Sequence, residues 1–442
     1  MALTPAGPPA PDGLAAPAAP ATAGHESAWY AQREANFSGG NEVTLLTGGD
    51  QLFPAMHAAI AQARHDVWLA TYIFHDDAAS RSMADALIAA AQRGVRVRVV
   101  VDGFGSKATL ATLRRWFEAS GVALAVFRPL DRWYAWLQPG QLRRLHQKLL
   151  ATDGEQAFVG GINIIGDRVD LNHGATPEPR LDYAVALRGP VAGPVAQTAR
   201  AMWTRAAFGR DWRDEVLALA RSAEPVARAR KLIRRLRITR DPADPPGEAA
   251  QPMQAAFLVR DNLSQRRAIE RSYIDALRQA RGRIDLVSAY FYPGRAFLRS
   301  LRDAARRGVQ VRLLLQGKLD YRFAGLAARV LYAEMLSYGV QIYEYMPAFL
   351  HAKAALVDDD WATVGSSNID PLSLLLNLEA NVVVRDRGFN AALGAAVEAA
   401  IAVSREVTAP PLAPGWPAAL RRGFVAWVAN WYLRLAGISA RY

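Results

Sequence analysis

The chain has 442 residues, enough for two ordinary domains with complete hydrophobic cores. It contains no cysteine, which excludes disulfides and thiolate metal sites. Lysine and arginine exceed aspartate and glutamate by 53 − 41 = 12 charges, a balance that suits an anionic partner, either nucleic acid or an acidic membrane surface.

The first part of the chain is rich in proline and alanine. Residues 1–24 carry no lysine or arginine, so they lack the cationic start of a signal peptide, and we expect a disordered leader over residues 1–40. No window of the sequence holds about 18 consecutive apolar residues, so no membrane-spanning helix is predicted.

A long duplication follows the leader. Residues 59–103 and 276–317 both read as a helix, an apolar run, a second helix and a second apolar run. The apolar runs are short and rich in β-branched residues, which is typical of buried strands, and Gly94 and Gly308 stop the second helix of each copy. Strands that alternate with helices predict an α/β fold in which helices cover both faces of a mostly parallel sheet.

A shorter repeat lies further along each copy. Residues 146–163 read HQKLLATDGEQAFVGGIN, and residues 351–368 read HAKAALVDDDWATVGSSN. Five residue types keep one spacing in both stretches, and a chance recurrence has odds of about one in a few million at average residue usage. These residues are His146, Lys148, Asp153, Gly160 and Asn163 in the first stretch and His351, Lys353, Asp358, Gly365 and Asn368 in the second.

The residue types favour chemistry on a phosphodiester. The two lysines and two asparagines supply positive charge and amide donors around a phosphate, so neither a metal nor a cofactor is expected. One histidine attacks phosphorus, and the other protonates the leaving alkoxide and then deprotonates the incoming hydroxyl. The loops after the short strands are expected to bring further groups to the phosphate, so the predicted substrate-binding residues are Asn163, Asn368, Gly160, Gly161, Ser366 and Ser367.

Each histidine needs a partner that holds the correct tautomer. Asp182 in RLDYAVAL and Glu379 in NLEANVVV occupy matched positions, in a Leu-acid-x-x-Val pattern that follows the asparagine of each stretch. We interpret both as orienting carboxylates. The alternative is a pair of surface carboxylates on edge strands.

The pattern H-x-K-x4-D-x6-G-[GS]-x-N, present twice, is similar to the signature of the phospholipase D superfamily. The resemblance covers residues 41–404 and implies one covalent phosphohistidine and one acid–base histidine. By the usual order of the family we assign these roles to His146 and His351, with the reverse assignment left open. Asp153 and Asp358 belong to the catalytic motif, but we expect them to order it rather than to make or break bonds.

The resemblance also implies two pseudo-symmetric lobes, each a mostly parallel β-sheet flanked by helices, with one shared active site at the lobe interface. We place the first lobe at residues 41–215, a basic linker at 216–252, the second lobe at 253–404 and an amphipathic C-terminal segment at 405–442.

Within the superfamily, several stretches resemble the bacterial cardiolipin synthases of the B type. They are VDGFGS at 101–106, RLDYAVALRGPV at 180–191, AYFYPGRAFL at 289–298 and DDDWATVGSSNIDPLSLLLNLEANV at 358–382. The resemblance implies transfer of a phosphatidyl group from phosphatidylglycerol to a second phosphatidylglycerol through a phosphohistidine, with release of glycerol. It also implies a peripheral membrane enzyme on the cytoplasmic face of the bacterial inner membrane.

Two aromatic stretches suit the headgroup level of a membrane. Trp133, Tyr134 and Trp136 stand between Arg128 and Arg144, just before the first histidine. Their alternative role is core packing. The final segment places its apolar residues at helical spacing, which predicts an amphipathic helix at the membrane interface with Trp427 and Trp431 as membrane contacts. The alternative role of this segment is a terminal helix that packs on one of the lobes.

Three other functions fit part of the pattern. A nuclease of the same superfamily would keep the site and the basic charge, but it needs a polar groove that follows a nucleic-acid backbone. A phospholipase D hydrolase or a transphosphatidylase with another acceptor uses the same intermediate, and a lipid-binding scaffold would have lost catalysis. The aromatic stretches favour lipid, so we expect phosphatidylglycerol and an anionic membrane surface as partners, and no nucleic acid.

Overall fold

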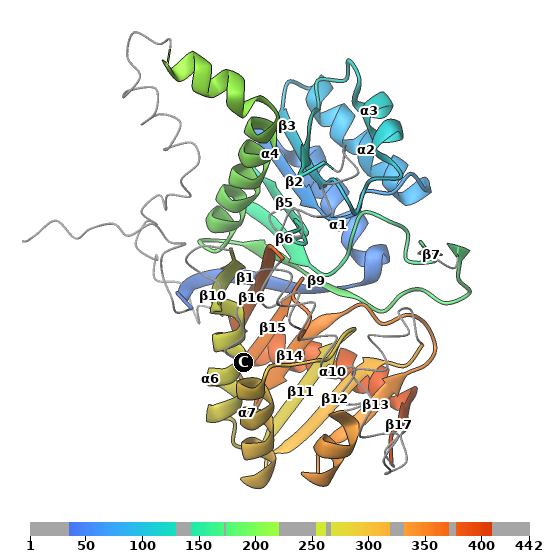
Figure 1. The fold of residues 1–442 in the computed structure, drawn as a ribbon, viewed down its shortest axis with the longest axis vertical. Helices are drawn as coiled ribbons and strands as arrows, with labels where there is room; N and C mark the ends of the chain where they lie inside the picture. Colours follow the sequence, from blue (N-terminus) through green and yellow to red (C-terminus); the bar gives the residue numbers. More distant parts are fainter. Residues whose placement is uncertain are drawn as a thin grey trace, which may run out of the picture.

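The computed structural model describes residues 35–129, 143–171, 174–220, 253–261, 267–318, 331–370 and 377–408. Figure 1 shows two α/β lobes, one above the other along the long axis. Fifteen strands of the described residues form one continuous sheet through both lobes, in the order β17-β13-β12-β11-β14-β15-β16-β10-β1-β9-β6-β5-β2-β3-β4. The predicted α/β fold with two pseudo-symmetric lobes is therefore confirmed.

The first lobe contains the following elements in chain order: β1 (Ser38–Thr47), α1 (Gly48–Gln62), β2 (Asp66–Thr71), α2 (Ala78–Gln92), β3 (Arg96–Asp102), α3 (Leu110–Phe117), β4 (Ala123–Phe127), β5 (Leu149–Thr152), β6 (Gln156–Gly160), β7 (Val169–Asp170), β8 (Gly174–Ala175), β9 (Tyr183–Arg188) and α4 (Ala192–Ala220). The second lobe has a similar order, without counterparts of β7 and β8 among its described residues and with an added last strand: β10 (Met253–Arg260), α6 (Ala268–Gln279), β11 (Arg283–Ser288), α7 (Arg295–Arg306), β12 (Gln310–Gln316), β13 (Gln341–Tyr345), β14 (Lys353–Val357), β15 (Trp361–Gly365), β16 (Glu379–Arg385), α10 (Arg387–Ala402) and β17 (Ser404–Glu406).

The sheet of each lobe is mixed rather than mostly parallel. Pairing is parallel from β2 through β3 to β4 and from β11 through β12 to β13, where a helical connection links consecutive strands. The strands that follow each histidine are joined by tight turns, β5 to β6 and β14 to β15, and a tight turn produces only antiparallel pairing. The expected parallel pairing therefore holds for β2, β3 and β4 and for β11, β12 and β13, while the edge strand β17 pairs antiparallel with β13.

The helix stops predicted at Gly94 and Gly308 are confirmed. Both glycines follow a helix and adopt a positive φ, +90° and +87°, which is strained for any side chain.

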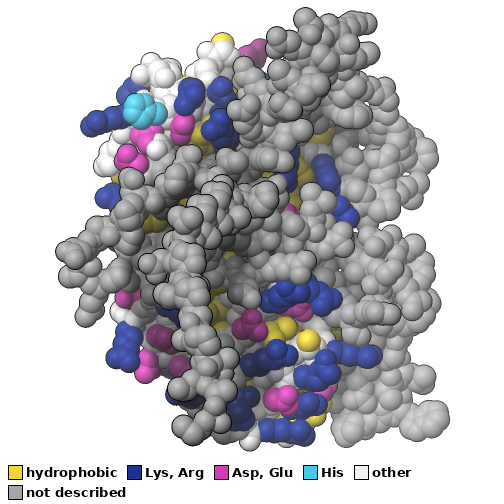
Figure 2. Space-filling model, turned by 90° about the vertical axis from the view of Figure 1, so that its left-hand side faces the viewer, with side chains coloured by type: hydrophobic (Ala, Val, Ile, Leu, Met, Phe, Trp, Pro, Cys, Tyr) yellow, Lys and Arg dark blue, Asp and Glu magenta, His cyan; other side chains and the backbone are white. Residues whose placement is uncertain are grey.

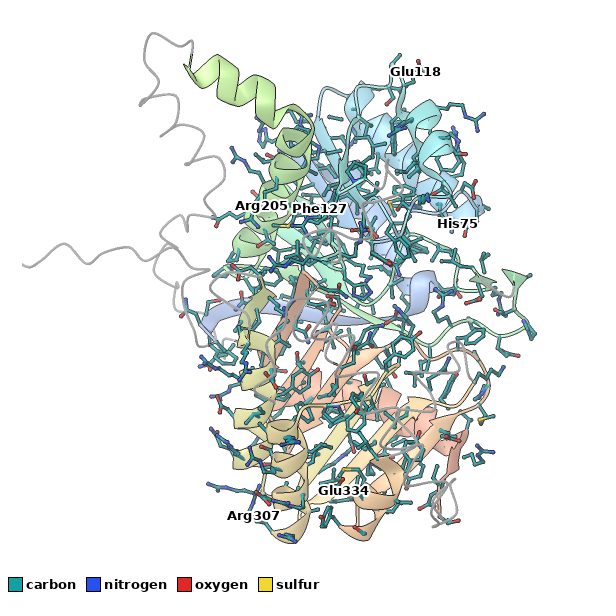
Figure 3. The ribbon with its side chains drawn as sticks, in the orientation of Figure 1. His75, Glu118, Phe127, Arg205, Arg307 and Glu334 are labelled. Atoms are coloured by element: carbon teal, nitrogen blue, oxygen red, sulfur yellow. The ribbon has the colours of Figure 1, made fainter. Side chains whose placement is uncertain are left out.

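Equivalent connections of the two lobes lie at opposite ends of the molecule. Glu118 follows α3 at one end, and Glu334, in the helical residues 331–337, lies at the other (Figure 3). The duplication in the sequence thus appears as a pseudo-twofold arrangement in space.

One hydrophobic core joins the two lobes. It runs along the sheet face that α4 covers in the first lobe and α10 covers in the second, and it includes Ala70 and Val100 together with Val287 and Leu314. The opposite face has a separate core in each lobe, under α1 and α2 or under α6 and α7. Because the shared core is continuous, burial of apolar surface holds the lobes in one relative position.

Exposed arginines gather on the second lobe, where dark blue side chains dominate the described lower part of Figure 2. The helices α1 and α2 of the first lobe carry Arg81 as their sole cation. Their counterparts α6 and α7 expose five arginines: Arg271, Arg278, Arg295, Arg299 and Arg306. Exposed arginines are thus more numerous on the helices of this face in the second lobe than on their counterparts in the first.

Regular elements extend slightly past the predicted lobe limits. Strand β1 begins at Ser38 within the predicted leader, α4 continues to Ala220, and β17 ends at Glu406. Residues 1–34, 221–252 and 409–442, which hold most of the predicted leader, linker and C-terminal segment, lie outside the described residues. None of the helices that the structure describes is both long enough and apolar enough to cross a bilayer.

Candidate active site

The histidines and the orienting acids pair across the lobe interface. His146, just before β5, places Nδ1 3.0 Å from Oε2 of Glu379, the first residue of β16 in the second lobe. His351, just before β14, places Nδ1 2.6 Å from Oδ2 of Asp182, which precedes β9 in the first lobe. Each histidine therefore takes its carboxylate from the other lobe.

Backbone hydrogen bonds hold these crossed pairs in register. The amide of His146 donates to the carbonyl of Leu378 at 3.0 Å, so the residue before Glu379 is tied to the first histidine. The amide of His351 donates to the carbonyl of Leu181 at 2.8 Å, so the residue before Asp182 is tied to the second. The chain segments that carry a histidine and its acid thus form one short bridge in each half-site.

The pairs set the protonation of the imidazoles. A carboxylate only accepts, so Nδ1–H donates to it and Nε2 keeps its lone pair. Burial lowers the pKa of His146, and it lowers the pKa of His351 to about 3. Burial alone would raise the pKa of both acids, but the neighbouring histidine and lysine hold the pKa of Asp182 and of Glu379 below the ordinary value. The resting site therefore holds neutral imidazoles beside ionised carboxylates.

Two buried lysines complete the site. Lys148 Nζ donates to the carbonyl oxygen of His146 at 2.7 Å, and Lys353 donates to that of His351. Burial lowers the pKa of Lys148 to about 7 and that of Lys353 to about 8. Each lysine also lowers the pKa of the histidine in the other lobe, so the two motifs lie within electrostatic reach of each other. The expectation of one shared site at the interface is confirmed.

Asp153 and Asp358 lie at the far ends of β5 and β14 from the histidines. Both adopt a positive φ, +54° and +50°, and each carboxylate accepts from three consecutive backbone N–H groups at the start of a neighbouring strand. This position fits the expected ordering role and not contact with the reacting phosphate. The donors are Arg64, His65 and Asp66 at 2.8 Å for Asp153, and Arg281, Gly282 and Arg283 at 2.7–3.0 Å for Asp358.

We expect Asp153→Asn to lower the free energy of unfolding by about 1–2 kcal/mol, because charge-assisted hydrogen bonds weaken while asparagine still tolerates the positive φ. The N–H donors hold the pKa of Asp153 below its ordinary value against the opposing effect of burial. The stabilisation is therefore present above the unfolded pKa, about 4, and is lost as pH falls through the folded pKa. Thermal unfolding of the variant and the wild type from pH 7 to pH 3 measures this: a constant difference in Tm would contradict it.

The loop residues after the motif strands pack against the two orienting acids and the strands that carry them. A Cβ on Gly160 would lie 2.5 Å from Cβ of Ala184, and one on Gly161 would lie 2.3 Å from Oδ1 of Asp182. Ser366, in the position of Gly161, donates to Glu379 Oε2 at 2.5 Å, and the amide of Ser367 donates to Asn381 Oδ1 at 3.3 Å. These contacts pack the four loop residues against the acids and against β9 and β16, and their contact with a substrate phosphate stays a prediction.

The two asparagines are buried beside the motifs, with 4% and 5% of their surface exposed. Asn163 Oδ1 accepts from the amide of Ile73 at 3.2 Å, whereas Asn368 Oδ1 finds no hydrogen-bond partner within the described residues. Their contact with substrate phosphate stays a prediction.

Sequence reasoning missed two residues of the site. The Tyr72 ring lies edge-on to His146, with ring centroids 5.0 Å apart. Asp102 is fully buried at the end of β3, accepts from the amide of Leu145 at 2.9 Å, and forms an ion pair with Arg144 at 3.7 Å. The available signal was position, since Tyr72 and Asp102 end or follow parallel strands at the edge where the histidines also lie.

One residue of the basic and aromatic stretch before His146 is buried inside the protein and does not lie on the surface where a lipid contact was expected. Arg144, which the sequence places among residues for lipid headgroups, is only 8% exposed and is paired with Asp102. The predicted membrane contacts lie outside the described residues and stay predictions: Trp133, Tyr134, Trp136, Trp427 and Trp431.

The duplicated lobes and the paired motifs are those of the phospholipase D superfamily. The chain matches the family described as "Cardiolipin synthase, PLD-like domain" over residues 56–176 and 273–400, and it belongs to that family. It is 39% identical to cardiolipin synthase B of Escherichia coli K12 over 355 residues, which is 80% of this chain and 79% of the relative. Cardiolipin synthase A of Pseudomonas entomophila is 30% identical over 371 residues, 84% of this chain and 70% of that protein.

Solved structures support the fold. Phosphatidylserine synthase from Haemophilus influenzae Rd KW20 superposes with a TM-score of 0.63, over 89% of this chain and 95% of that protein. The sequence identity of that pair is 13%, so the likeness concerns the two-lobe fold alone.

Proposed function

We propose that this protein is a cardiolipin synthase that transfers a phosphatidyl group from one phosphatidylglycerol to another and releases glycerol. The observation that carries the proposal is the pair of crossed histidine–carboxylate contacts, with a buried lysine beside each histidine. Such a site offers a nucleophile, an acid–base group and fixed positive charge around one phosphate. Kinship with cardiolipin synthases A and B supports this choice of reaction.

In the first step, Nε2 of His146 attacks phosphorus and the bond from phosphorus to the glycerol oxygen breaks. His351 gives its proton to the leaving alkoxide. The pKa of His351 is low in the resting site, but an anionic phosphodiester between the lobes favours the imidazolium, so substrate binding supplies the acid. Asp182 stabilises that imidazolium through Nδ1.

In the second step, His351 takes the proton of a glycerol hydroxyl on the second phosphatidylglycerol. The oxygen attacks phosphorus and the phosphorus–nitrogen bond to His146 breaks, which regenerates the neutral imidazole. Lys148 and Lys353 neutralise the phosphoryl oxygens in both steps, because the bound anionic phosphodiester favours their ammonium forms before further charge develops on phosphorus. Water in place of the second lipid gives phosphatidic acid.

The test uses purified protein and vesicles of phosphatidylglycerol mixed with phosphatidylcholine. We expect equal amounts of cardiolipin and glycerol, measured by mass spectrometry and by a glycerol assay, and no product from vesicles of phosphatidylcholine alone. Phosphatidic acid as the main product would favour the hydrolase. Transfer of the phosphatidyl group to an added alcohol would favour a transphosphatidylase with a broader choice of acceptor. Cleavage of single-stranded DNA, with the lipids left unchanged, would favour a nuclease.

We further propose peripheral attachment at the cytoplasmic face of the bacterial inner membrane. The net charge of +12 supports this location, because a cationic protein is attracted to anionic lipid. The exposed arginines on α6 and α7 contribute to that charge. The aromatic residues before His146 would then hold the site at headgroup level by apolar burial.

Replacement of Trp133 and Trp136 by alanine is expected to reduce turnover on phosphatidylglycerol vesicles about tenfold, and turnover on a short-chain, water-soluble phosphodiester by less than twofold. The reason is that loss of interfacial burial affects only the membrane-bound substrate. Both rates are measured on the same preparation. Equal losses on the two substrates would instead assign these tryptophans to the core.

A further inference from the structure

The two half-sites differ beside the reacting histidines. Alignment of the duplicated strands places Tyr72 after β2 and Ala289 after β11. A hydrogen bond that occurs in both lobes confirms this alignment. The hydroxyl of the last residue of each strand donates to the backbone carbonyl two residues later, from Thr71 to Ile73 at 3.0 Å and from Ser288 to Tyr290 at 2.7 Å. An aromatic ring in the first lobe therefore corresponds to a methyl group in the second.

The Tyr72 ring contacts both reactive groups of its half-site. Its centroid lies 5.0 Å from that of His146 with the planes at 61°, and Lys148 Nζ lies 5.5 Å from the same centroid. Such distances allow an edge contact to the imidazole and a cation–π contact to the ammonium. His351 and Lys353 make neither kind of ring contact within the described residues.

The first lobe also holds this ring in place. A Cβ on Gly105 would lie 2.9 Å from the Tyr72 ring and 2.4 Å from its carbonyl oxygen, so the chain after β3 passes directly against the tyrosine. The Asp102 carboxylate fixes that chain segment, because it accepts hydrogen bonds from the amides of Phe104 at 2.8 Å and Gly105 at 3.1 Å. The same carboxylate accepts from the amide of Leu145, so it fixes the ring and the segment that carries His146 together.

The second lobe has a neutral side chain in place of this carboxylate. Gln316, at the end of β12, accepts from the amide of Leu350 at 2.8 Å, just before His351. The backbone before each histidine is therefore held in both lobes, while among the described residues only the first histidine has an aromatic ring beside it.

We propose that Tyr72 is a positioning residue that holds the His146 imidazole and the charged Lys148 ammonium on the first-lobe side of the site, and that it makes the two half-sites functionally unequal. The proposal rests on the proposed function because it assumes that His146 attacks phosphorus. An attacking ring must keep one orientation, and the lysine beside it must stay charged although it is buried.

The charge of Lys148 depends on more than the tyrosine. Burial lowers the pKa of Lys148 to about 7, and Lys353 lowers it too; the opposing groups are Glu379, Asp182 and Asp102. A cation–π contact favours the ammonium, so removal of the ring should lower the pKa of Lys148 further, by about one pH unit. Phenylalanine keeps the ring and should preserve the effect.

The experiment compares Tyr72→Phe, Tyr72→Leu and Tyr72→Met on bis-para-nitrophenyl phosphate across pH. We expect the phenylalanine variant to stay within about twofold of the wild type. Leucine and methionine should lower kcat about ten- to a hundredfold with a smaller change in KM, and should move the alkaline limb of the pH profile about one unit toward acid. Tyr338→Leu is the matched control, since that ring contacts Arg306 at 5.3 Å on the second lobe, outside the site.

A second measurement does not depend on turnover. Competitive acetylation of lysines with acetic anhydride across pH, read by peptide mass spectrometry, reports the pKa of Lys148 directly. An unchanged Lys148 profile and an unchanged alkaline limb in the leucine and methionine variants would overturn the role of Tyr72. If the wild type forms no cardiolipin but the Lys148 profile still shifts, the proposed function fails and the role of Tyr72 stands.

Discussion

His146→Ala is expected to abolish turnover on every phosphodiester, whereas His351→Ala should still cleave a substrate with a good leaving group once. Alanine at position 146 removes the atom that attacks phosphorus, so no covalent intermediate forms. Loss of the acid at position 351 costs about 10²–10⁴-fold when the leaving group is a glycerol alkoxide. A para-nitrophenolate leaves without a proton, so that the first step survives.

The second step needs a base, so the covalent intermediate should accumulate in His351→Ala. We expect a burst of about one para-nitrophenolate for each active site, followed by a stall, and a phosphoryl group on residue 146 by peptide mass spectrometry of samples kept at neutral or alkaline pH. The double variant without both histidines is the control and should give no burst. A phosphoryl group found on His351 in the otherwise intact protein would reverse the assignment.

Glu379→Gln is expected to lower kcat by about 10²–10⁴-fold on lipid and on the activated diester, because loss of a carboxylate that holds a histidine tautomer has effects of this size. The carboxylate contacts His146 from the other lobe, at 3.0 Å. A glutamine can turn its NH₂ group toward Nδ1, which stabilises the wrong tautomer and removes the charge that supports attack.

Asp182→Asn tests the crossed pairing with the same two substrates. Its carboxylate contacts His351, so the variant should behave like His351→Ala and keep the burst on the activated diester. Glu398→Gln is the control, since that half-exposed glutamate pairs with the buried Arg312 near the start of β12, in the second lobe. A burst in Glu379→Gln and none in Asp182→Asn would contradict this assignment. It would mean either that each histidine works with the acid of its own lobe or that the two histidines exchange roles. The histidine that carries the phosphoryl group distinguishes these two explanations.

Much of the site was predictable because the information is local. His146 and Lys148 lie two residues apart at the start of a short strand, and the same arrangement recurs at His351 and Lys353. The ordering role of Asp153 was also expected from the motif, and its three N–H donors are consistent with that role. Short-range spacing of this kind survives folding because neighbouring residues remain neighbours.

The partners of the histidines could not be predicted in the same way. Glu379 is 233 residues from His146, and Asp182 is 169 residues from His351. Both acids follow their own motif in the same pattern, so the sequence leaves open whether a pair forms within one lobe or between lobes. Tyr72 and Asp102 escaped notice for a related reason, because no motif surrounds them and only their places at strand ends indicate that they lie near His146.

The sequence by itself determined that the chain is duplicated, that each copy alternates helices with strands, and that each carries a histidine, a lysine and an acid for phosphodiester chemistry. Only the tertiary structure decided that the acids are exchanged between the lobes and that the motif strands pair antiparallel. It also decided that, among the described residues, an aromatic ring lies beside His146 and none beside His351. The physical reason is that spacing along the chain fixes which groups a segment presents. Which groups meet depends on a shared core and on backbone bridges between distant segments, such as Leu145 with Leu378 and Leu181 with Leu350.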